Sequence, residues 1–88
     1  MEYEWDPRKA AANVVKHGVA FEHVVDFQWE SARLGEDRRH RYGEKRFIAL
    51  GLIGERVHVV IFTLRGTTIR IISLRKANER ERRSYERA

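Results

Sequence analysis

The sequence contains no cysteine, so it can form neither a disulfide framework nor a zinc site built on thiolates. Unbroken apolar runs such as Val59–Phe62 are far too short to cross a bilayer. The first residues, Met1–Asp6, are acidic and lack the apolar segment of a signal peptide. We therefore expect a soluble, cytoplasmic protein that makes no contact with a membrane.

The composition is that of one small domain, spanning residues 1–88. Hydrophobic residues make up 42% of the chain and charged residues 35%, which predicts a small core under a charged surface. A domain of this size buries only about 60% of the surface that its unfolded chain exposes. We therefore expect marginal stability, to which a partner would add.

Positive charge is concentrated in the second half of the chain. Residues 1–44 hold 7 Lys and Arg against 9 Asp and Glu, whereas residues 45–88 hold 11 against 4. Most of these cations are arginines, whose planar guanidinium matches the oxygens of a phosphate. The asymmetry favours an anionic partner, nucleic acid above all, over the alternative of a charged surface that only keeps the protein soluble.

Helix signals dominate the first part of the chain. Alternation over residues 2–5 predicts a short strand, and Asp6-Pro7 starts a helix that ends at Lys16-His17-Gly18, with glycine as the left-handed cap. A second short helix is expected over residues 21–27, with Phe21, Val24 and Val25 facing inward, although Ala20 is a poor capping residue.

Strand signals dominate the middle of the chain. Strands are predicted over residues 31–36, 46–53, 56–64 and 69–74, with a charged loop at 37–43 and turns at 54–55 and 65–68. The short connections favour antiparallel pairing. A capping box at Asn78–Glu81 starts the last helix. The order β-α-α-β-β-β-β-α predicts an α+β fold, an antiparallel sheet with helices on one face.

Motifs along nearly the whole chain carry a resemblance to a known family. They are Trp5-Asp6, Lys9, Asn13, Lys16-His17-Gly18-Val19, Phe21-Glu22, Tyr42-Gly43-Glu44, the run Ile69-Arg70-Ile71-Ile72-Ser73-Leu74-Arg75-Lys76-Ala77, and Glu81 followed by Tyr85-Glu86. With these motifs the chain resembles the BrnT toxins, bacterial type II toxins with a RelE-like fold. The two main anchors are the Lys-His-Gly-Val block and the block that begins at Ile69, about 50 residues apart.

The resemblance implies an endoribonuclease that inhibits translation. It also implies a cognate BrnA-like antitoxin with a ribbon-helix-helix fold that neutralises the toxin. DNA would be contacted only indirectly, through the antitoxin, when the complex represses its own operon.

The residues themselves limit the chemistry of such a nuclease. No two of the four histidines stand at the helical i, i+4 spacing, and no Asp-x-Asp pair occurs, so we expect neither a metal site nor any other cofactor. No Ser or Cys nucleophile motif and no glycine-rich phosphate loop are present. What remains for RNA is metal-free cleavage, in which the 2′-hydroxyl attacks the adjacent phosphate and the enzyme moves protons and neutralises charge.

Arg65, Arg70 and Arg75 are the first candidates for phosphate contacts. Arg70 interrupts an apolar strand, where it either binds phosphate or covers the sheet with its stem. Arg75 precedes the last helix, whose N-terminal dipole favours anions, and Arg65 lies at a turn.

Proton transfer and further RNA contacts have several candidates. His58 is a candidate general acid or base on a strand, and Arg46 is expected on the face that His58 shares with Arg70. Glu44 and Tyr85 are further catalytic candidates in recurring family positions, although packing against the sheet is the simpler role for Tyr85. The candidate RNA-binding residues are Arg46, Lys16, His17 and Lys76, and capping the helix end is the alternative role for His17.

Two functions therefore remain open. The first is a metal-independent endoribonuclease toxin. The second is a noncatalytic module that binds RNA or an antitoxin through an Arg-rich, phosphate-docking surface. Both need the same cations, so the sequence does not separate them.

Overall fold

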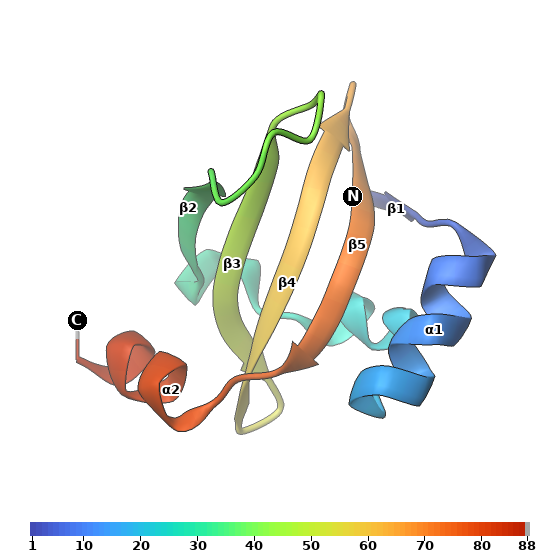
Figure 1. Ribbon diagram of the computed structural model, residues 1–88. Helices are drawn as coiled ribbons and strands as arrows, with labels where there is room; N and C mark the ends of the chain where they lie inside the picture. Colours follow the sequence, from blue (N-terminus) through green and yellow to red (C-terminus); the bar gives the residue numbers. More distant parts are fainter. Residues whose placement is uncertain (88) are drawn as a thin grey trace.

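The computed structural model describes residues 1–87; Ala88 lies outside the described residues. It has the predicted α+β class, with a five-stranded sheet in the order β1-β5-β4-β3-β2 (Figure 1). In chain order the elements are β1 (Glu2–Glu4), α1 (Pro7–His17), the 3₁₀ helices η1 (Phe21–Asp26) and η2 (Trp29–Ser31), β2 (Arg33–Asp37), β3 (Arg46–Ile53), β4 (Arg56–Arg65), β5 (Thr68–Lys76) and α2 (Glu79–Glu86).

The sheet is mixed, not purely antiparallel as the sequence suggested. The strands β2 to β5 pair antiparallel through short connections, as expected. β1 instead pairs parallel with β5, with Tyr3 opposite Ile69. The prediction was wrong for β1 because only strands joined by a tight turn must run antiparallel, and β1 is separated from β5 by most of the chain.

The first helix follows its sequence signals. The Asp6 side chain accepts a hydrogen bond from the backbone N–H of Arg8 at 2.9 Å. Gly18 ends the helix with a φ of 72°, a left-handed conformation that glycine adopts without strain.

The second helix is a 3₁₀ helix that begins after Ala20 without a side-chain cap. Three residues per turn bring Phe21, Val24 and Phe27 onto one buried face. Val25 falls between these positions and is 69% exposed, so its expected inward orientation was wrong.

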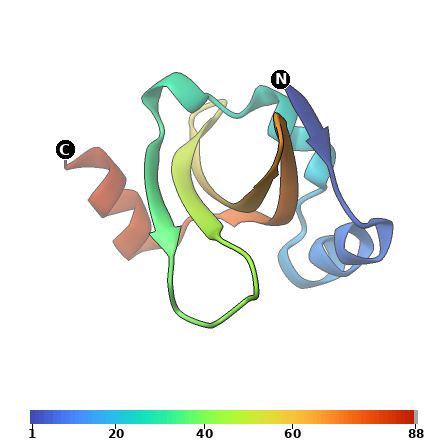
Figure 2. The ribbon, with the colours of Figure 1, turned by 90° about the horizontal axis from the view of Figure 1, so that it is seen from above.

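Each face of the sheet carries its own apolar cluster. On the rear face, η1 packs on strand residues that include Ala49, Val60, Phe62, Ile71 and Leu74. On the front face, the cluster contains Val57, Val59, Ile61 and Ala77, flanked by Ile48, Leu50, Leu52, Ile72 and Tyr85. Figure 2 shows that the sheet is strongly curved and that α1 and α2 lie at opposite sides of it. The expectation that the helices pack on one face of the sheet was therefore wrong. Tyr85 of α2 packs on the front cluster, whereas η1 packs on the rear cluster.

Candidate nucleic-acid interface

Three arginines lie on the front face of the sheet. Arg46 precedes Ile48 by two residues, and Arg70 lies between the rear-facing Ile69 and Ile71, so strand alternation directs both to the front. Thr63 of β4 pairs with Arg70 of β5. The preceding residue, Phe62, pairs with Phe47, which follows Arg46 on β3, so Arg46 and Arg70 flank Thr63 from the two neighbouring strands. Arg75 pairs with the front-facing Val59. The front face therefore combines an apolar floor with three guanidinium groups.

Each of these guanidinium groups has a carboxylate partner. Arg46 lies 3.4 Å from Glu44, and Arg70 lies 2.6 Å from Glu4 on β1. Arg75 is held by both carboxylate oxygens of Glu81, at 2.8 and 2.9 Å. A phosphate that binds here must therefore compete with carboxylates of the chain itself.

Glu81 is ionised in this arrangement. The hydrogen bonds from Arg75 lower the pKa of Glu81, the backbone N–H of Asn78 lowers it further, and partial burial opposes them. Glu81 also completes the capping box of α2, because its carboxylate accepts from Asn78 N–H while Glu81 N–H donates to the Asn78 side chain. The same carboxylate thus starts α2 and neutralises Arg75.

The loop between β2 and β3 is organised around the buried carboxylate of Asp37. Arg39 donates to both oxygens of Asp37, at 2.8 and 2.9 Å, and the Tyr42 hydroxyl donates to it at 3.2 Å. These hydrogen bonds from Arg39 hold the pKa of Asp37 far below its usual range. Tyr42 in turn lies under the Arg46 guanidinium, 4.1 Å from ring centre to carbon, in a cation–π contact. The loop therefore fixes the orientation of Arg46.

A hollow of about 250 Å³ lies between α1 and β5, beside the front-face residue Ile72. Its polar lining comes from Lys9, Asn13, Lys16, His17 and Ser73. Burial lowers the pKa of His17, and the charges of Lys16 and Arg75 lower it further. The imidazole is consequently neutral near neutral pH and lies within electrostatic reach of Arg75.

Asn13 fixes the position of this hollow. Its side-chain amide donates to the carbonyl oxygens of Leu74 at 2.7 Å and Val19 at 2.9 Å, and it accepts from Leu74 N–H at 3.3 Å. The side chain thus pairs with the edge of β5 as a neighbouring strand would. The sequence signal for this role is a polar residue on the apolar face of the helix, whereas Asn13 was identified from the sequence only as part of a family motif.

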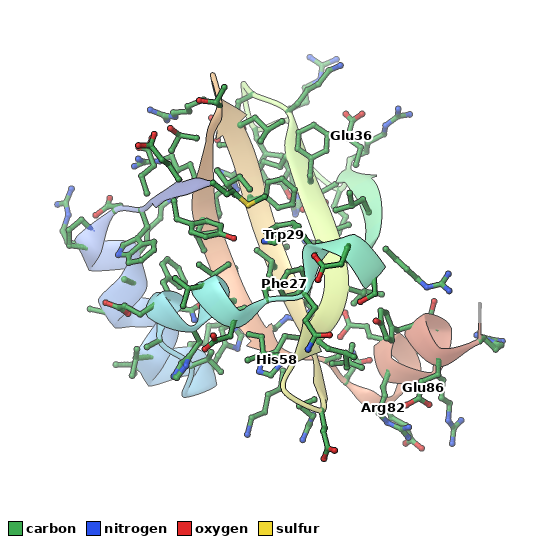
Figure 3. All side chains as sticks on the ribbon, turned by 180° about the vertical axis from the view of Figure 1, so that it is seen from behind. Phe27, Trp29, Glu36, His58, Arg82 and Glu86 are labelled. Carbon is green, nitrogen blue, oxygen red and sulfur yellow. The ribbon has the colours of Figure 1, made fainter. Side chains whose placement is uncertain are left out.

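His58 lies on the rear face, contrary to its expected place beside Arg46 and Arg70. Its neighbours Val57 and Val59 face the front, so strand alternation turns His58 to the rear, where Figure 3 shows it from behind. It lines a separate hollow of about 220 Å³ with Lys76, Gly18 and His23. Burial lowers the pKa of His58, against a raising effect from its hydrogen bond to Arg56, and Arg56 and Lys76 lower it further by their charge.

The remaining candidates lie away from this centre. Arg65 lines a hollow of about 400 Å³ with Glu44, Lys45 and Thr63, at the end of β4. The Tyr85 hydroxyl donates to the Ser31 carbonyl at 3.2 Å, and its ring lies 5.9 Å from the Arg33 guanidinium. The structure thus brings Lys16 and His17 together in one hollow, with Arg75 within electrostatic reach of His17. Arg46 and Arg70 share the sheet face of Arg75, whereas Arg65, His58, Lys76 and Tyr85 lie apart from this group. Lys9 is a cation of the hollow that sequence reasoning missed.

Two further properties of residues 1–87 concern metal binding and membrane insertion. Among these residues, no three His, Asp or Glu side chains are grouped so that they could hold a metal ion. No helix in this part of the chain has the length and apolarity needed to span a membrane.

Residues 5–81 match a family model described as the ribonuclease toxin BrnT of type II toxin–antitoxin systems. The chain belongs to the BrnT family. The match covers α1, the strands β2 to β5 and the start of α2, and so includes Arg46, Arg70 and Arg75 of the front face. No curated protein matches the chain. Membership of the BrnT family makes this a toxin-type ribonuclease domain whose partners are an RNA target and an antitoxin.

Proposed function

We propose that this BrnT-family chain is a metal-independent endoribonuclease that inhibits translation in the cytoplasm, built on a RelE-like variant of its α+β fold. The observation that carries the proposal is the hollow where α1 meets β5, which is lined by Lys9, Lys16 and His17. Arg75 on the front face of β5 is near enough to lower the pKa of His17 by its charge. Arg46 and Arg70 extend the cationic surface across the sheet. Its antitoxin would be a BrnA-like ribbon-helix-helix protein, through which alone the complex would contact DNA.

In this proposal the RNA backbone follows the hollow between α1 and β5. Lys9 and Lys16 contact the flanking phosphates, and Arg75 and Arg70 contact the scissile one. Arg75 leaves Glu81 for the phosphate, which offers the same bidentate geometry and gains further negative charge only as the pentavalent transition state forms.

The chemical step needs a base for the 2′-hydroxyl. His17 accepts that proton, the 2′-oxygen bonds to phosphorus, and the bond from phosphorus to the 5′-oxygen breaks. Water supplies the proton for the departing 5′-oxygen, so the products carry a 2′,3′-cyclic phosphate and a 5′-hydroxyl. The lowered pKa of His17 supports this role, because the neutral form is the one that accepts a proton. His58 is less suited, since it lies on the other face of the sheet.

The second candidate function is a noncatalytic module that docks RNA or the antitoxin through the same arginines. The observation that favours it is the pairing of Arg46, Arg70 and Arg75 with Glu44, Glu4 and Glu81, which leaves the front face closer to neutral than its arginines alone suggest.

Incubation of the purified protein with a long RNA in EDTA separates the two functions. Discrete fragments that end in 2′,3′-cyclic phosphate support the nuclease, and His17→Gln should remove them while Arg56→Ala, at the far β3–β4 turn, should not. Intact RNA, bound with a log–log salt slope of about −0.7 per phosphate contacted, would support the docking module instead.

A further inference from the structure

An uncovered apolar groove runs across the rear face of the sheet. It has a volume of about 500 Å³ and almost no polar lining. Leu34 is 63% exposed and Leu64 is 53% exposed, which is unusual for two leucines that share one surface. The residues that line it are Trp29, Leu34, Gly35, Glu36, Phe47, Phe62, Leu64 and Ile69.

The groove exists because the covering elements stop short of the end of the sheet. η1 and the segment with Phe27 and Trp29 pack over the middle of the rear face, and the chain then turns into β2. Figure 3 shows this from behind, with the upper part of the sheet uncovered between Trp29 and Glu36. β2 is one of the two edge strands of the sheet, and its residues 33–36 are exposed. The groove is therefore open to a partner along the β2 edge.

Cations without a partner lie at one end of the groove. Phe47 and Leu64 also line the neighbouring hollow, which contains Lys45 and Arg65. Within residues 1–87, no carboxylate lies within ion-pair distance of either cation. The two nearby carboxylates are already engaged, Glu44 with Arg46 at 3.4 Å and Glu36 with Arg38 at 3.3 Å. An occupant of the groove would therefore gain from carrying negative charge at this end.

We propose that the groove binds an amphipathic, acidic segment of the antitoxin, with apolar side chains between Leu34 and Leu64 and carboxylates on Lys45 and Arg65. This inference rests on the proposed function for the existence of an antitoxin, and it adds where that partner binds. RNA fits the groove less well, because the walls of the groove are apolar, whereas the arginines of the front face can bind the phosphates of RNA. The groove lies on the opposite face of the sheet from Arg75. An antitoxin segment bound in the groove therefore adds to the affinity of the complex and leaves the front face uncovered.

The apolar part of the proposal is tested with Leu34→Ser and Leu64→Ser. Binding to a BrnA-like ribbon-helix-helix antitoxin, the partner named in the proposed function, is measured by isothermal titration calorimetry. Each variant should weaken binding about tenfold, since each loses the burial of one leucine side chain in the complex. Val15→Ser and Val25→Ser are matched controls, because Val15 (89% exposed) and Val25 lie on α1 and η1, away from the groove. These two should bind as the parent protein does.

The charged part is tested with Lys45→Glu. This variant should weaken antitoxin binding and reduce its dependence on salt, whereas Arg56→Glu, at the opposite end of β4, should change neither. Trp29 provides a direct signal, because Trp5→Phe leaves it as the only tryptophan of the chain. Its emission should shift on addition of antitoxin and stay constant on addition of a 2′-O-methyl RNA.

The outcomes separate this inference from the nuclease proposal. Unchanged antitoxin affinity in both leucine variants would overturn the inference, even if the protein cleaves RNA. The inference would also be overturned if the chain alone formed a dimer that becomes monomeric in the leucine variants, since the groove would then be a contact between two copies of the chain. A leucine variant that loses RNA binding and keeps antitoxin binding would equally contradict it. If the parent protein does not cleave RNA but the leucine variants lose antitoxin affinity, the nuclease proposal fails and the inference stands.

Discussion

Arg75 and Glu81 form a two-pronged ion pair that joins β5 to the first turn of α2, with N–O distances of 2.8 and 2.9 Å. Both side chains are mostly buried. The pair therefore does two things at once. It holds α2 against the front face, and it occupies the guanidinium that we assign to the scissile phosphate. Release of Arg75 from Glu81 is a cost that RNA binding must overcome.

Glu81→Gln should therefore tighten RNA binding. The amide still accepts the capping hydrogen bond from Asn78 N–H, so α2 keeps its start, but the charge that competes with phosphate is lost. We expect severalfold higher affinity for a 2′-O-methyl RNA, which binds without being cleaved, and a salt slope steeper by about 0.7. Fluorescence anisotropy measures both. Glu79→Gln is the control, because Glu79 pairs with Arg83 on the solvent side of the same helix. Equal affinities in all three proteins would show that Arg75 does not contact phosphate.

Arg70→Ala should abolish growth inhibition and leave the fold intact. Its partner Glu4 is half-exposed, and such ion pairs contribute only about 0–1 kcal/mol to stability. Loss of a guanidinium that contacts the scissile phosphate should lower the cleavage rate about 10²–10³-fold. Growth assays and thermal melting measure the two effects.

Glu4→Gln separates the ion pair from the guanidinium. This variant breaks the pair with Arg70 and retains the cation, so it should remain toxic. If Arg70→Ala and Glu4→Gln lost activity and melting temperature together, Arg70 would have a structural role only.

Elements bounded by local signals were predictable from the sequence. The strand Arg46–Ile53 was predicted to the residue, because Gly54 ends it at a turn. The capping box at Asn78–Glu81 was confirmed because both of its hydrogen bonds are formed between residues three apart. The parallel pairing of β1 with β5 was not predictable from local signals, because it joins residues about 66 apart in the chain.

The sequence predicted which types of residue make up the candidate site, but it did not predict which of these residues lie together. Arg70 was recognised as a charge inside an apolar strand. Its relation to His58 depended on which residues of β4 and β5 are paired, and a shift of one residue exchanges the two faces of a strand. A β-bulge between Ile61 and Phe62 changes that register within the sheet. The place of His17 in the hollow beside Ile72 depended on the Asn13 hydrogen bonds that join α1 to β5, which no pattern of charges reveals.

Asn13→Ala should destabilise the protein by about 2–4 kcal/mol. The substitution leaves the Leu74 N–H and the Leu74 and Val19 carbonyl oxygens without the hydrogen bonds that the amide makes in a buried setting. Urea unfolding followed by circular dichroism measures the change. Ala12→Ser, at an exposed position next in the chain, should stay within about 0.5 kcal/mol of the parent. A loss below about 1 kcal/mol in Asn13→Ala would mean that α1 is held to β5 by other contacts.

Stability should fall as the pH is lowered from about 7 to about 5, in part because of His58. Burial keeps the pKa of His58 in the folded protein below its ordinary value of 6.5, so the unfolded chain binds the proton more readily. The stabilisation is thus fully present above pH 6.5 and is lost as the pH falls toward the folded-state pKa, with a slope of at most about 1.4 kcal/mol per pH unit for one proton.

His58→Gln should flatten this pH dependence. Urea titrations at several pH values between about 5 and 8 measure it. Some slope should remain, because the pKa of His17 is lowered too, and the double variant His17→Gln/His58→Gln should remove most of it. Ala12→Ser, at an exposed position of α1 without a titratable side chain, is the control that should keep the parent slope. An unchanged slope in His58→Gln would mean that His58 is already well solvated in the folded protein, and that the hollow beside Lys76 is open to water.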